Sequence, residues 1–320
     1  MKRILLITTT MLMLFGFSVS ADATTVPQKL TKISLMLDWF VNPNHGPIII
    51  AQERGYFKQH GIEVDIQQPA DPSLPPKLVA ANKIDLAVSY QPNLTIDVAA
   101  GLPLIKTATL IATPLNALIV LKKSGISDLS QLKGKTIGIS VAGNEDATIG
   151  AMLADHGVTL SDVNIVNVGW ALSSSLASGK VDAIWGGLRN FETNQLALEG
   201  YPTTSFFPEE NGIPSYDELI FVANSKHYNR QAITAFNAAI TQATTYIINH
   251  PQAAWQQFIQ YAPDTLDNKL NHQAWNDTLT RFALRPAAVD LKRYDDYAQF
   301  LFTHHVITQQ PQAKNYIGSF

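Results

Sequence analysis

The chain has 320 residues, of which 46% are hydrophobic and 15% charged, with a formal net charge of −3 and no cysteine. This length suffices for two ordinary domains, and the composition excludes disordered and fibrous chains. The absence of cysteine excludes disulfides, zinc–thiolate sites, iron–sulfur clusters, thiol nucleophiles and a lipidated cysteine. The 23 basic residues against 26 acidic ones provide no basic field for nucleic acid.

Residues 1–23 are predicted to be a cleaved signal peptide. Lys2 and Arg3 supply positive charge, residues 4–17 carry no charge, and small residues follow them. Cleavage after Ser20 or after Ala23 satisfies the small-x-small rule. An uncleaved anchor is the alternative, but the uncharged run is short for a membrane span. We therefore expect an exported protein that is not lipid-anchored.

Alternating strands and helices are predicted after this segment. Strands are expected at residues 32–37, 62–66, 84–88 and 104–111, and helices at residues 47–54, 74–81 and 94–100. Strands and helices that alternate at this spacing are typical of βαβ units and of a mostly parallel sheet.

A second set of the same kind begins near residue 115. Its expected strands are 118–121, 136–139, 163–168, 182–185 and 219–223, with a helical turn at 128–133 and helices at 147–154 and 173–177. The pattern is helical from there on, with helices expected at 230–249, 253–261 and 291–303.

Two α/β sets followed by a helical tail predict two lobes joined by two crossings. The first lobe comprises residues 24–115 and 225–320, and the second comprises residues 116–224. The cleft between such lobes is the expected ligand site, at the carboxyl ends of strands and the amino ends of helices. Hinge closure over a ligand is a natural motion for this arrangement.

Aromatic residues at two strand ends are candidates for the walls of this cleft. Trp39 follows the first strand, and Tyr90 follows the third with Gln91 beside it. Both rings face the core in one interpretation, whereas in the other they stack on a flat ring. Because both follow strands of one predicted sheet, we expect them to point into the same crevice.

Polar residues near Trp39 are further candidates. Asp38, Asn44 and His45 lie in the same segment. His45 either hydrogen-bonds within its own loop or faces the cleft, where a neutral imidazole binds a ring nitrogen. No other histidine has metal-ligand spacing to it, so no metal site is expected.

The second lobe contributes candidates at its strand exits and near the return crossing. The loop at Gly143, Asn144 and Glu145 either presents backbone N–H groups to a ligand or caps a helix. The other candidates of this lobe are Asn116, Trp185, Gly186, Glu192, Tyr216 and Asp217. Carboxylates here favour a ligand with N–H donors, and the scarcity of arginine disfavours a sulfonate or phosphate ester.

Several segments resemble one family of solute-binding proteins. The most specific is Asp38-Trp39-Phe40-Val41-Asn42-Pro43-Asn44-His45, and others are Ala51–Phe57, Ala87–Gln91, Asp128–Gly138, Gly179–Ala183 and Gly212–Glu218. Over about residues 31 to 260 the chain resembles the thiamine-pyrimidine branch of periplasmic solute-binding proteins for ABC importers. This branch is similar to the fungal thiamine pyrimidine synthase.

The resemblance implies a type II periplasmic binding protein-like fold of class α/β, with two mostly parallel sheets flanked by helices and a cleft between them. It implies capture of a pyrimidine ligand, hydroxymethylpyrimidine or its aminomethyl or formylamino relative, for an ABC permease and its ATPase. Glu192 resembles the family carboxylate that meets the aminopyrimidine. The resemblance implies a periplasmic location, and we expect a monomer without a cofactor.

Two alternatives remain beside this interpretation. Another flat heterocycle, such as a riboflavin-like molecule or a nucleobase, suits the same aromatic walls. The second alternative is the synthase, which is an enzyme with a lysine-bound pyridoxal and a cysteine-rich segment. That segment falls near residues 213–218, where this chain has no thiol, and no catalytic set emerges elsewhere, so we expect a binding protein.

Overall fold

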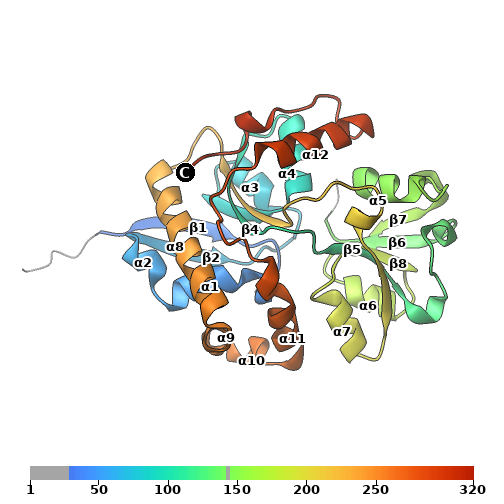
Figure 1. Cartoon of the computed structure of the whole chain (residues 1–320), viewed down its shortest axis with the longest axis horizontal. Coiled ribbons are helices and arrows are strands. Elements are labelled where there is room, and N and C mark those ends of the chain that lie inside the picture. The colour runs from blue at the N-terminus through green and yellow to red at the C-terminus, as the bar shows by residue number, and fades with distance from the viewer. Residues whose placement is uncertain (1–28, 142–144) are drawn as a thin grey trace, which may run out of the picture.

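The computed structural model describes residues 29–141 and 145–320 (Figure 1). Within these ranges ten strands form two five-stranded sheets, one in each half of the molecule. The first sheet has the order β2-β1-β3-β10-β4, from β1 (Thr31–Met36), β2 (Ile62–Gln67), β3 (Leu86–Ser89), β4 (Leu104–Ile111) and β10 (Leu219–Asn224). The second has the order β7-β6-β8-β5-β9, from β5 (Asn116–Leu121), β6 (Thr136–Ile139), β7 (Asn164–Asn167), β8 (Ala183–Leu188) and β9 (Thr203–Phe206). The predicted signal peptide lies outside the described residues.

Both sheets are mixed, and in each of them one strand runs against the other four. In the first, β1 is parallel to β2 and β3, whereas β10 is antiparallel to β3 and β4. In the second, β6 is parallel to β7 and β8, whereas β5 is antiparallel to β8 and β9. The antiparallel strands β5 and β10 are those that follow the two crossings. Each enters its sheet from the side of the other half, so it runs against the strands of the βαβ units.

Helices cover both faces of the first sheet. Phe221 and Ala223 of β10 face a core that contains α1 (Gly46–Glu53), α8 (Arg230–Asn249) and α9 (Pro251–Gln260). Ile220 and Val222 of the same strand face the other core, with α3 (Pro75–Ala80) and α4 (Gln91–Ala99). Alternate residues of one strand therefore fill two cores, as expected for a sheet buried on both sides.

The second sheet is also covered on both faces. Leu118 and Val120 pack with α5 (Glu145–Ala154), whereas Ala117 and Ile119 pack with α6 (Leu172–Ala177) and α7 (Glu192–Leu198). The predicted α/β class with two helix-flanked sheets and a helical tail is therefore confirmed.

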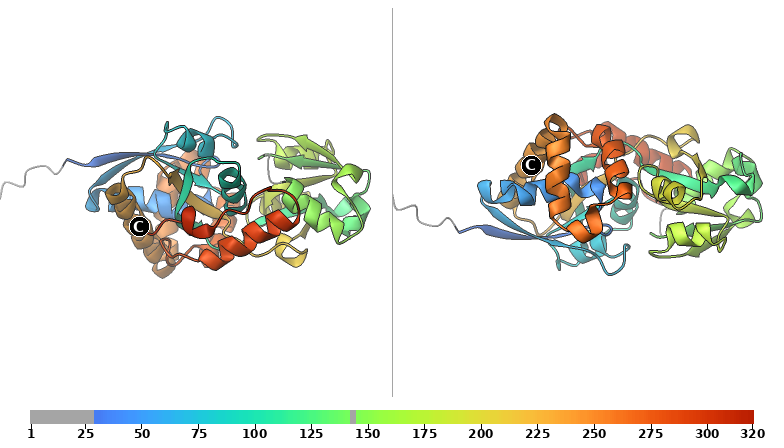
Figure 2. Two further views of the ribbon diagram at one scale, coloured as in Figure 1. Left: turned by 90° about the horizontal axis from the view of Figure 1, so that it is seen from above. Right: turned by 90° about the horizontal axis from the view of Figure 1, so that it is seen from below.

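The last long helix, α12 (Leu291–Thr303), contacts both halves. Its Tyr294 belongs to a core cluster of the first sheet, whereas Tyr297, Phe300 and Leu301 belong to a cluster of the second. Figures 1 and 2 show α12 beside α4, running from the first half toward the second. The C-terminal helices therefore pack on the first sheet and also bridge to the second.

Several short elements are absent from the sequence prediction. They are α2 (Tyr56–Gln59), α7, β9, α10 (Pro263–Leu266) and α11 (Lys269–Thr278). In addition, α4 begins at Gln91 rather than Leu94, because Pro92 is tolerated in the first turn of a helix. None of the helices in the described ranges is both long enough and apolar enough to cross a membrane.

Candidate functional site

A pocket lies between the two halves of the molecule. The first half contributes Asp38, Trp39, Asn42, Asn44 and Tyr90, the second contributes Asn116, Trp185, Gly186, Phe191 and Glu192, and the return crossing contributes Tyr216 and Glu218. Its cavity volume is about 60 Å³. Both halves and one crossing therefore supply the walls of a single small cavity.

The pocket brings together nine of the residues predicted from the sequence: Asp38, Trp39, Asn44, Tyr90, Asn116, Trp185, Gly186, Glu192 and Tyr216. His45, Gln91 and Asp217 do not line it. Gly143 and Asn144 lie outside the described residues, and Glu145 begins α5 with a side chain that is outside them too.

Asp38 is held by two side chains of the first half. Nε2 of His45 lies 2.9 Å from Oδ1 of Asp38, and the Tyr90 hydroxyl donates to Oδ2 at 2.8 Å. The backbone N–H of Asn42 donates to Nδ1 of His45 at 3.2 Å, so the ring proton is on Nε2 and is donated to Asp38. Both oxygens of this carboxylate are therefore oriented, and lone pairs remain for a donor in the pocket.

His45 is thus not a wall of the cavity, contrary to the possibility that it faces the cleft. Its side chain is fully buried behind Asp38, in a short 3-10 helix at Pro43–His45. His45 hydrogen-bonds within its own loop, which is the first of the two interpretations above. It acts on the pocket through Asp38.

Trp39 forms one wall, and its ring meets the other half of the molecule. The ring centroid lies 4.2 Å from that of Trp170, which precedes α6, and 5.5 Å from that of Phe40. Nε1 of Trp39 is buried without a hydrogen-bond partner among the described residues. A buried donor of this kind is available to a ligand acceptor. Trp170 was not predicted from the sequence, because it lies in a loop with no polar pattern.

Glu192 and Glu218 are buried carboxyl groups that line the pocket. The backbone N–H of Leu188 donates to Glu192 at 2.7 Å, and those of Leu115 and Asn116 donate to Glu218 at 2.6 and 2.9 Å. Burial raises the pKa of Glu192 to about 7, and the backbone donor offsets this shift only in part. Burial likewise raises the pKa of Glu218 to about 7. Both groups therefore titrate near neutral pH.

Glu218 was missed in the sequence, where Asp217 was chosen instead. The two are adjacent in the stretch before β10, so their side chains point to opposite sides of an extended chain. If the Asp217 side chain points away from the pocket, that of Glu218 points into it. The sequence alone does not reveal which of the two side chains faces the pocket.

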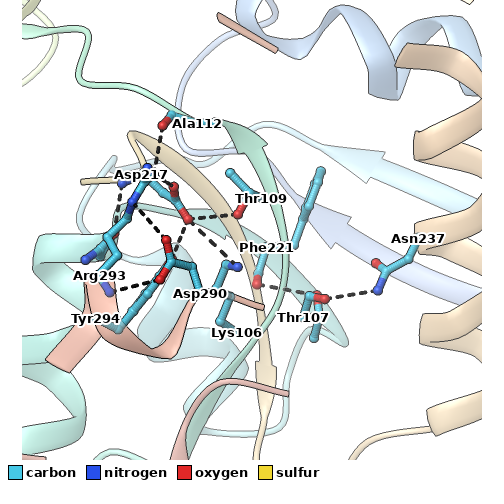
Figure 3. Close-up of polar contacts among 11 residues, drawn as sticks. Lys106, Thr107, Thr109, Ala112, Asp217, Phe221, Asn237, Asp290, Arg293 and Tyr294 are labelled. Carbon is cyan, nitrogen blue, oxygen red and sulfur yellow. Dashed lines mark hydrogen bonds and ion pairs between the residues drawn. The ribbon is translucent and has the colours of Figure 1, made fainter. Parts of the chain in front are cut away.

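The Asp217 carboxylate lies in a polar network away from the pocket (Figure 3). It accepts hydrogen bonds from Thr109 and Tyr294, both at 2.9 Å, and from Arg293. Nζ of Lys106 lies 3.8 Å from it. Asp217, which we expected to contact a ligand, therefore does not line the pocket, because cations and hydroxyls of β4 and α12 already satisfy its carboxylate.

Gln91 is also not part of the pocket wall. Its side-chain oxygen accepts the backbone N–H of Asp217 at 2.8 Å, and the residue is fully buried. It therefore holds the return crossing in place beside the pocket.

Hydrogen bonds also join the two halves across the cleft. Nδ2 of Asn190, between β8 and α7, donates to Oδ1 of Asn44 at 2.7 Å and to Thr278 at 2.7 Å. The Trp170 indole lies 3.4 Å from the backbone oxygen of Ala70. Polar and aromatic contacts therefore close the mouth of the pocket in this conformation.

Positive charge is missing from the wall of the pocket, as far as the described residues show. Arg189, close in sequence to Glu192, forms a double contact with Glu209 at 2.7 and 2.9 Å and also donates to the Leu115 and Asn116 carbonyls. Three carboxyl groups, of Asp38, Glu192 and Glu218, thus face a cavity whose described lining contains no lysine or arginine. No group of three or more metal-ligating side chains occurs in the described parts of the chain.

Two α/β halves that enclose a pocket between their sheets define the fold of periplasmic binding proteins. The alkanesulfonate-binding protein SsuA of Xanthomonas axonopodis pv. citri, solved with bound MOPS, has the same fold, with a TM-score of 0.71 over 91% of this chain and 99% of that one. The two share 15% identity, so this likeness establishes the fold alone.

The chain belongs to the NMT1/THI5-like family, whose profile matches residues 42–254. A Haemophilus influenzae protein named as a thiamine biosynthesis protein is 50% identical over 89% of this chain and 91% of its own length. The formylaminopyrimidine-binding protein of Halalkalibacterium halodurans is 30% identical over 79% of this chain and 78% of its own. The resemblance to a thiamine-pyrimidine family is therefore confirmed.

The same family includes enzymes. The 4-amino-5-hydroxymethyl-2-methylpyrimidine phosphate synthase THI13 of Saccharomyces cerevisiae is 28% identical over 79% of this chain and 77% of its own length. Family membership by itself does not separate a binding protein from a synthase, so that distinction depends on the residues of the pocket.

Proposed function

We propose that the chain is the solute-binding protein of an ABC importer and captures a thiamine pyrimidine precursor. The observation that carries the proposal is a pocket with three carboxyl groups, two aromatic walls and no lysine or arginine among its described lining residues. A 4-aminopyrimidine presents N–H donors and a flat ring, so carboxylate acceptors and stacking walls both suit it. The names of two relatives, for thiamine biosynthesis and formylaminopyrimidine binding, support the same ligand class.

An alkanesulfonate, as bound by proteins of the same fold, fits this pocket less well. Its negative charge would be repelled by the carboxyl groups, and the described pocket wall has no lysine or arginine to offset the repulsion. A flavin, with three fused rings, and a small nucleobase are the remaining flat heterocycles, and a binding assay separates them from the pyrimidine precursors.

A binding role is favoured over the synthase reaction. The chain has no cysteine, and Pro214-Ser215-Tyr216-Asp217-Glu218 stands where the resemblance places the synthase's cysteine-rich segment. Neither a lysine nor a histidine lines the described part of the pocket. The described part of the pocket therefore lacks the lysine, and the chain lacks the thiols, that the resemblance assigns to the synthase.

Capture is proposed to occur by closure of two lobes, residues 24–115 with 225–320 and residues 116–224. The contacts Asn190 to Asn44 and Trp170 to Trp39 would then form as the lobes close over the ring. The permease would recognise the closed form in the periplasm, where a monomer without a lipid anchor arrives after removal of the signal peptide.

Purified mature protein tests the proposal directly. Thermal shift and native mass spectrometry are measured with hydroxymethyl-, aminomethyl- and formylaminomethyl-pyrimidines, and with thiamine, riboflavin, a nucleobase and taurine. Stabilisation by a pyrimidine precursor is expected. If riboflavin, the nucleobase or taurine binds and no precursor does, the ligand class is wrong. Pyridoxal phosphate retained on a lysine, together with turnover, would instead favour the synthase.

Trp39→Ala provides the matched test of the site. Loss of a stacking wall is expected to weaken precursor binding about tenfold or more while the protein stays folded. Phe302→Ala removes an exposed aromatic side chain of α12 and serves as the control. Unchanged affinity in Trp39→Ala would assign Trp39 to the core only.

A further inference from the structure

A second, smaller cavity adjoins the pocket. Asp38, Tyr90, Asn93 and Val141 line both cavities, so the two are neighbouring compartments. The volume of the second cavity is about 40 Å³. This volume is enough for a small polar group. We call this cavity the side chamber.

The side chamber contains a buried hydroxyl group without a partner. Ser89, the last residue of β3, is 1% exposed and lines the chamber but not the main pocket. Its Oγ has no hydrogen-bond partner among the described residues. Because an unsatisfied buried polar group costs about 1–3 kcal/mol, a hydroxyl in this position points to a polar group that enters the chamber.

Opposite charges complete the chamber. Asp97 of α4 and Lys77 of α3 both line it. Burial raises the pKa of Asp97 to about 6, and the Lys77 ammonium offsets this shift only in part. Since Lys77 is exposed and Asp97 is half-buried, the carboxylate is the less well solvated of the two. The chamber thus offers a strong acceptor and two donors, the Ser89 hydroxyl and the Lys77 ammonium.

We propose that the side chamber is a subsite for an amide-bearing arm on the ring that occupies the main pocket. The arm's N–H donates to Asp97, and its carbonyl oxygen accepts from Ser89 or Lys77. A protonated amine would match Asp97 but would be repelled by Lys77, and a hydroxymethyl arm is shorter and carries no carbonyl. The inference deepens the proposed function, on which it rests, because it selects the formylamino relative among the precursors.

Two variants test the subsite without touching the main pocket. Ser89→Val fills the chamber with a side chain that suits a strand, and Asp97→Asn removes the charge at nearly constant shape. Calorimetry with the formylaminomethyl- and hydroxymethyl-pyrimidines measures both affinities. In each variant we expect about a tenfold loss or more for the formylaminomethyl compound, as for a lost charged hydrogen bond, and a change within about twofold for the hydroxymethyl compound. Asp264→Asn, an exposed carboxylate of α10, is the charge-matched control.

The outcomes separate this inference from the proposed function. If no pyrimidine binds the unmodified protein, the proposed function fails. If pyrimidines bind, but the two variants weaken the binding of every pyrimidine equally or weaken the binding of none, the chamber is not a subsite. The proposed function then stands. Should Ser89→Val fail to fold, Ser89→Ala keeps the test, because it removes the hydroxyl without adding volume. A preference of the unmodified protein for the hydroxymethyl compound would also overturn the inference.

Discussion

Two buried acidic regions of this molecule are built in opposite ways. At the return crossing, Asp217 meets Lys106 and Arg293, so its charge is neutralised inside the protein. In the pocket, Glu192 and Glu218 accept hydrogen bonds from backbone N–H groups, and their pKa values rise to about 7 because of burial. A carboxylate that is already paired stabilises the fold, whereas one left without a cation is available to a ligand with donors.

The paired region also ties together the parts that a hinge would move. Arg293 of α12 donates to the backbone oxygen of Ala112 in the first crossing at 2.9 Å and contacts Asp217 beside the second (Figure 3). A charge pair placed there fixes both crossings to one helix. The unpaired carboxyl groups lie where the two halves meet and where a bound ring would contact both.

The largest effect is expected from removal of the paired charge. Asp217→Asn leaves the buried Lys106 ammonium, which is 3% exposed, without its ion-pair partner, and leaves Arg293 with Asp290 alone. We expect the free energy of unfolding to fall by about 3–5 kcal/mol, because an unpaired charge then remains buried. Urea unfolding followed by tryptophan fluorescence measures the change.

Asp290→Asn is the matched control for that experiment. Asp290 also lies near Arg293, at 3.7 Å, but its side chain is 59% exposed. Its removal is expected to cost less than about 1 kcal/mol. Equal losses in the two variants would contradict the view that burial makes the Asp217 pair essential.

The opposite sign is expected for a pocket carboxylate. The pKa of Glu192 is about 7 in the folded protein against an ordinary value of 4.5. Folding therefore favours the protonated form, and stability falls as pH rises from about 4.5 through about 7. Glu192→Gln removes this penalty, so the ligand-free variant should gain about 1–3 kcal/mol at pH 8 and nothing at pH 4.

The same substitution should weaken binding of the pyrimidine precursor, because a charged acceptor is lost. We expect an affinity loss of about tenfold or more at pH 8. Unfolding curves at the two pH values and calorimetry at pH 8 test both halves of the prediction. Glu199→Gln, an exposed residue that follows α7, should change neither quantity. A variant that is less stable at pH 8 would show that Glu192 is a structural carboxylate like Asp217.

This contrast also marks how far sequence reasoning reached. The alternation of strands and helices predicted both sheets and the cleft, and strand ends predicted Asp38, Trp39 and Tyr90 at one edge. Strand direction was not predictable for β5 and β10, since the chain pattern does not reveal from which side a crossing enters a sheet. The parallel pairs, formed by consecutive βαβ units, were predictable because the connections of these units are local.

The candidate site was predicted less completely for the same physical reason. Asp217 and Glu218 are neighbours of the same charge, and their roles depend on Lys106 and Arg293, which are distant in sequence. Trp170 enters the site only through contact between the two halves. Local pattern thus finds residues at strand ends, whereas long-range pairing decides which of them are free for a ligand.

A smaller effect is expected from the histidine behind the pocket. His45→Asn keeps the acceptor for the Asn42 N–H but loses the donor to Asp38, whereas His45→Gln keeps a donor near the Nε2 position. We expect His45→Asn to weaken precursor binding about fivefold, as for one lost hydrogen bond, and His45→Gln to restore part of it. Calorimetry, with urea unfolding as the measure of stability, separates the two roles. If both variants lose the same affinity, and these losses parallel their losses of stability, the role of His45 is purely structural.

The smallest effect is expected at the mouth of the pocket. Trp170 is 42% exposed, yet its ring meets Trp39 across the cleft at 4.2 Å. Trp170→Leu keeps an apolar side chain but loses the aromatic pair, which contributes about 0.5–1.5 kcal/mol. Because the pair joins the two halves and touches no carboxylate, the closed form should become less populated without a change in the pH dependence of binding. Calorimetry at several pH values, with small-angle scattering to follow closure, tests this, and an altered pH profile would show that Trp170 acts on the pocket carboxyl groups instead.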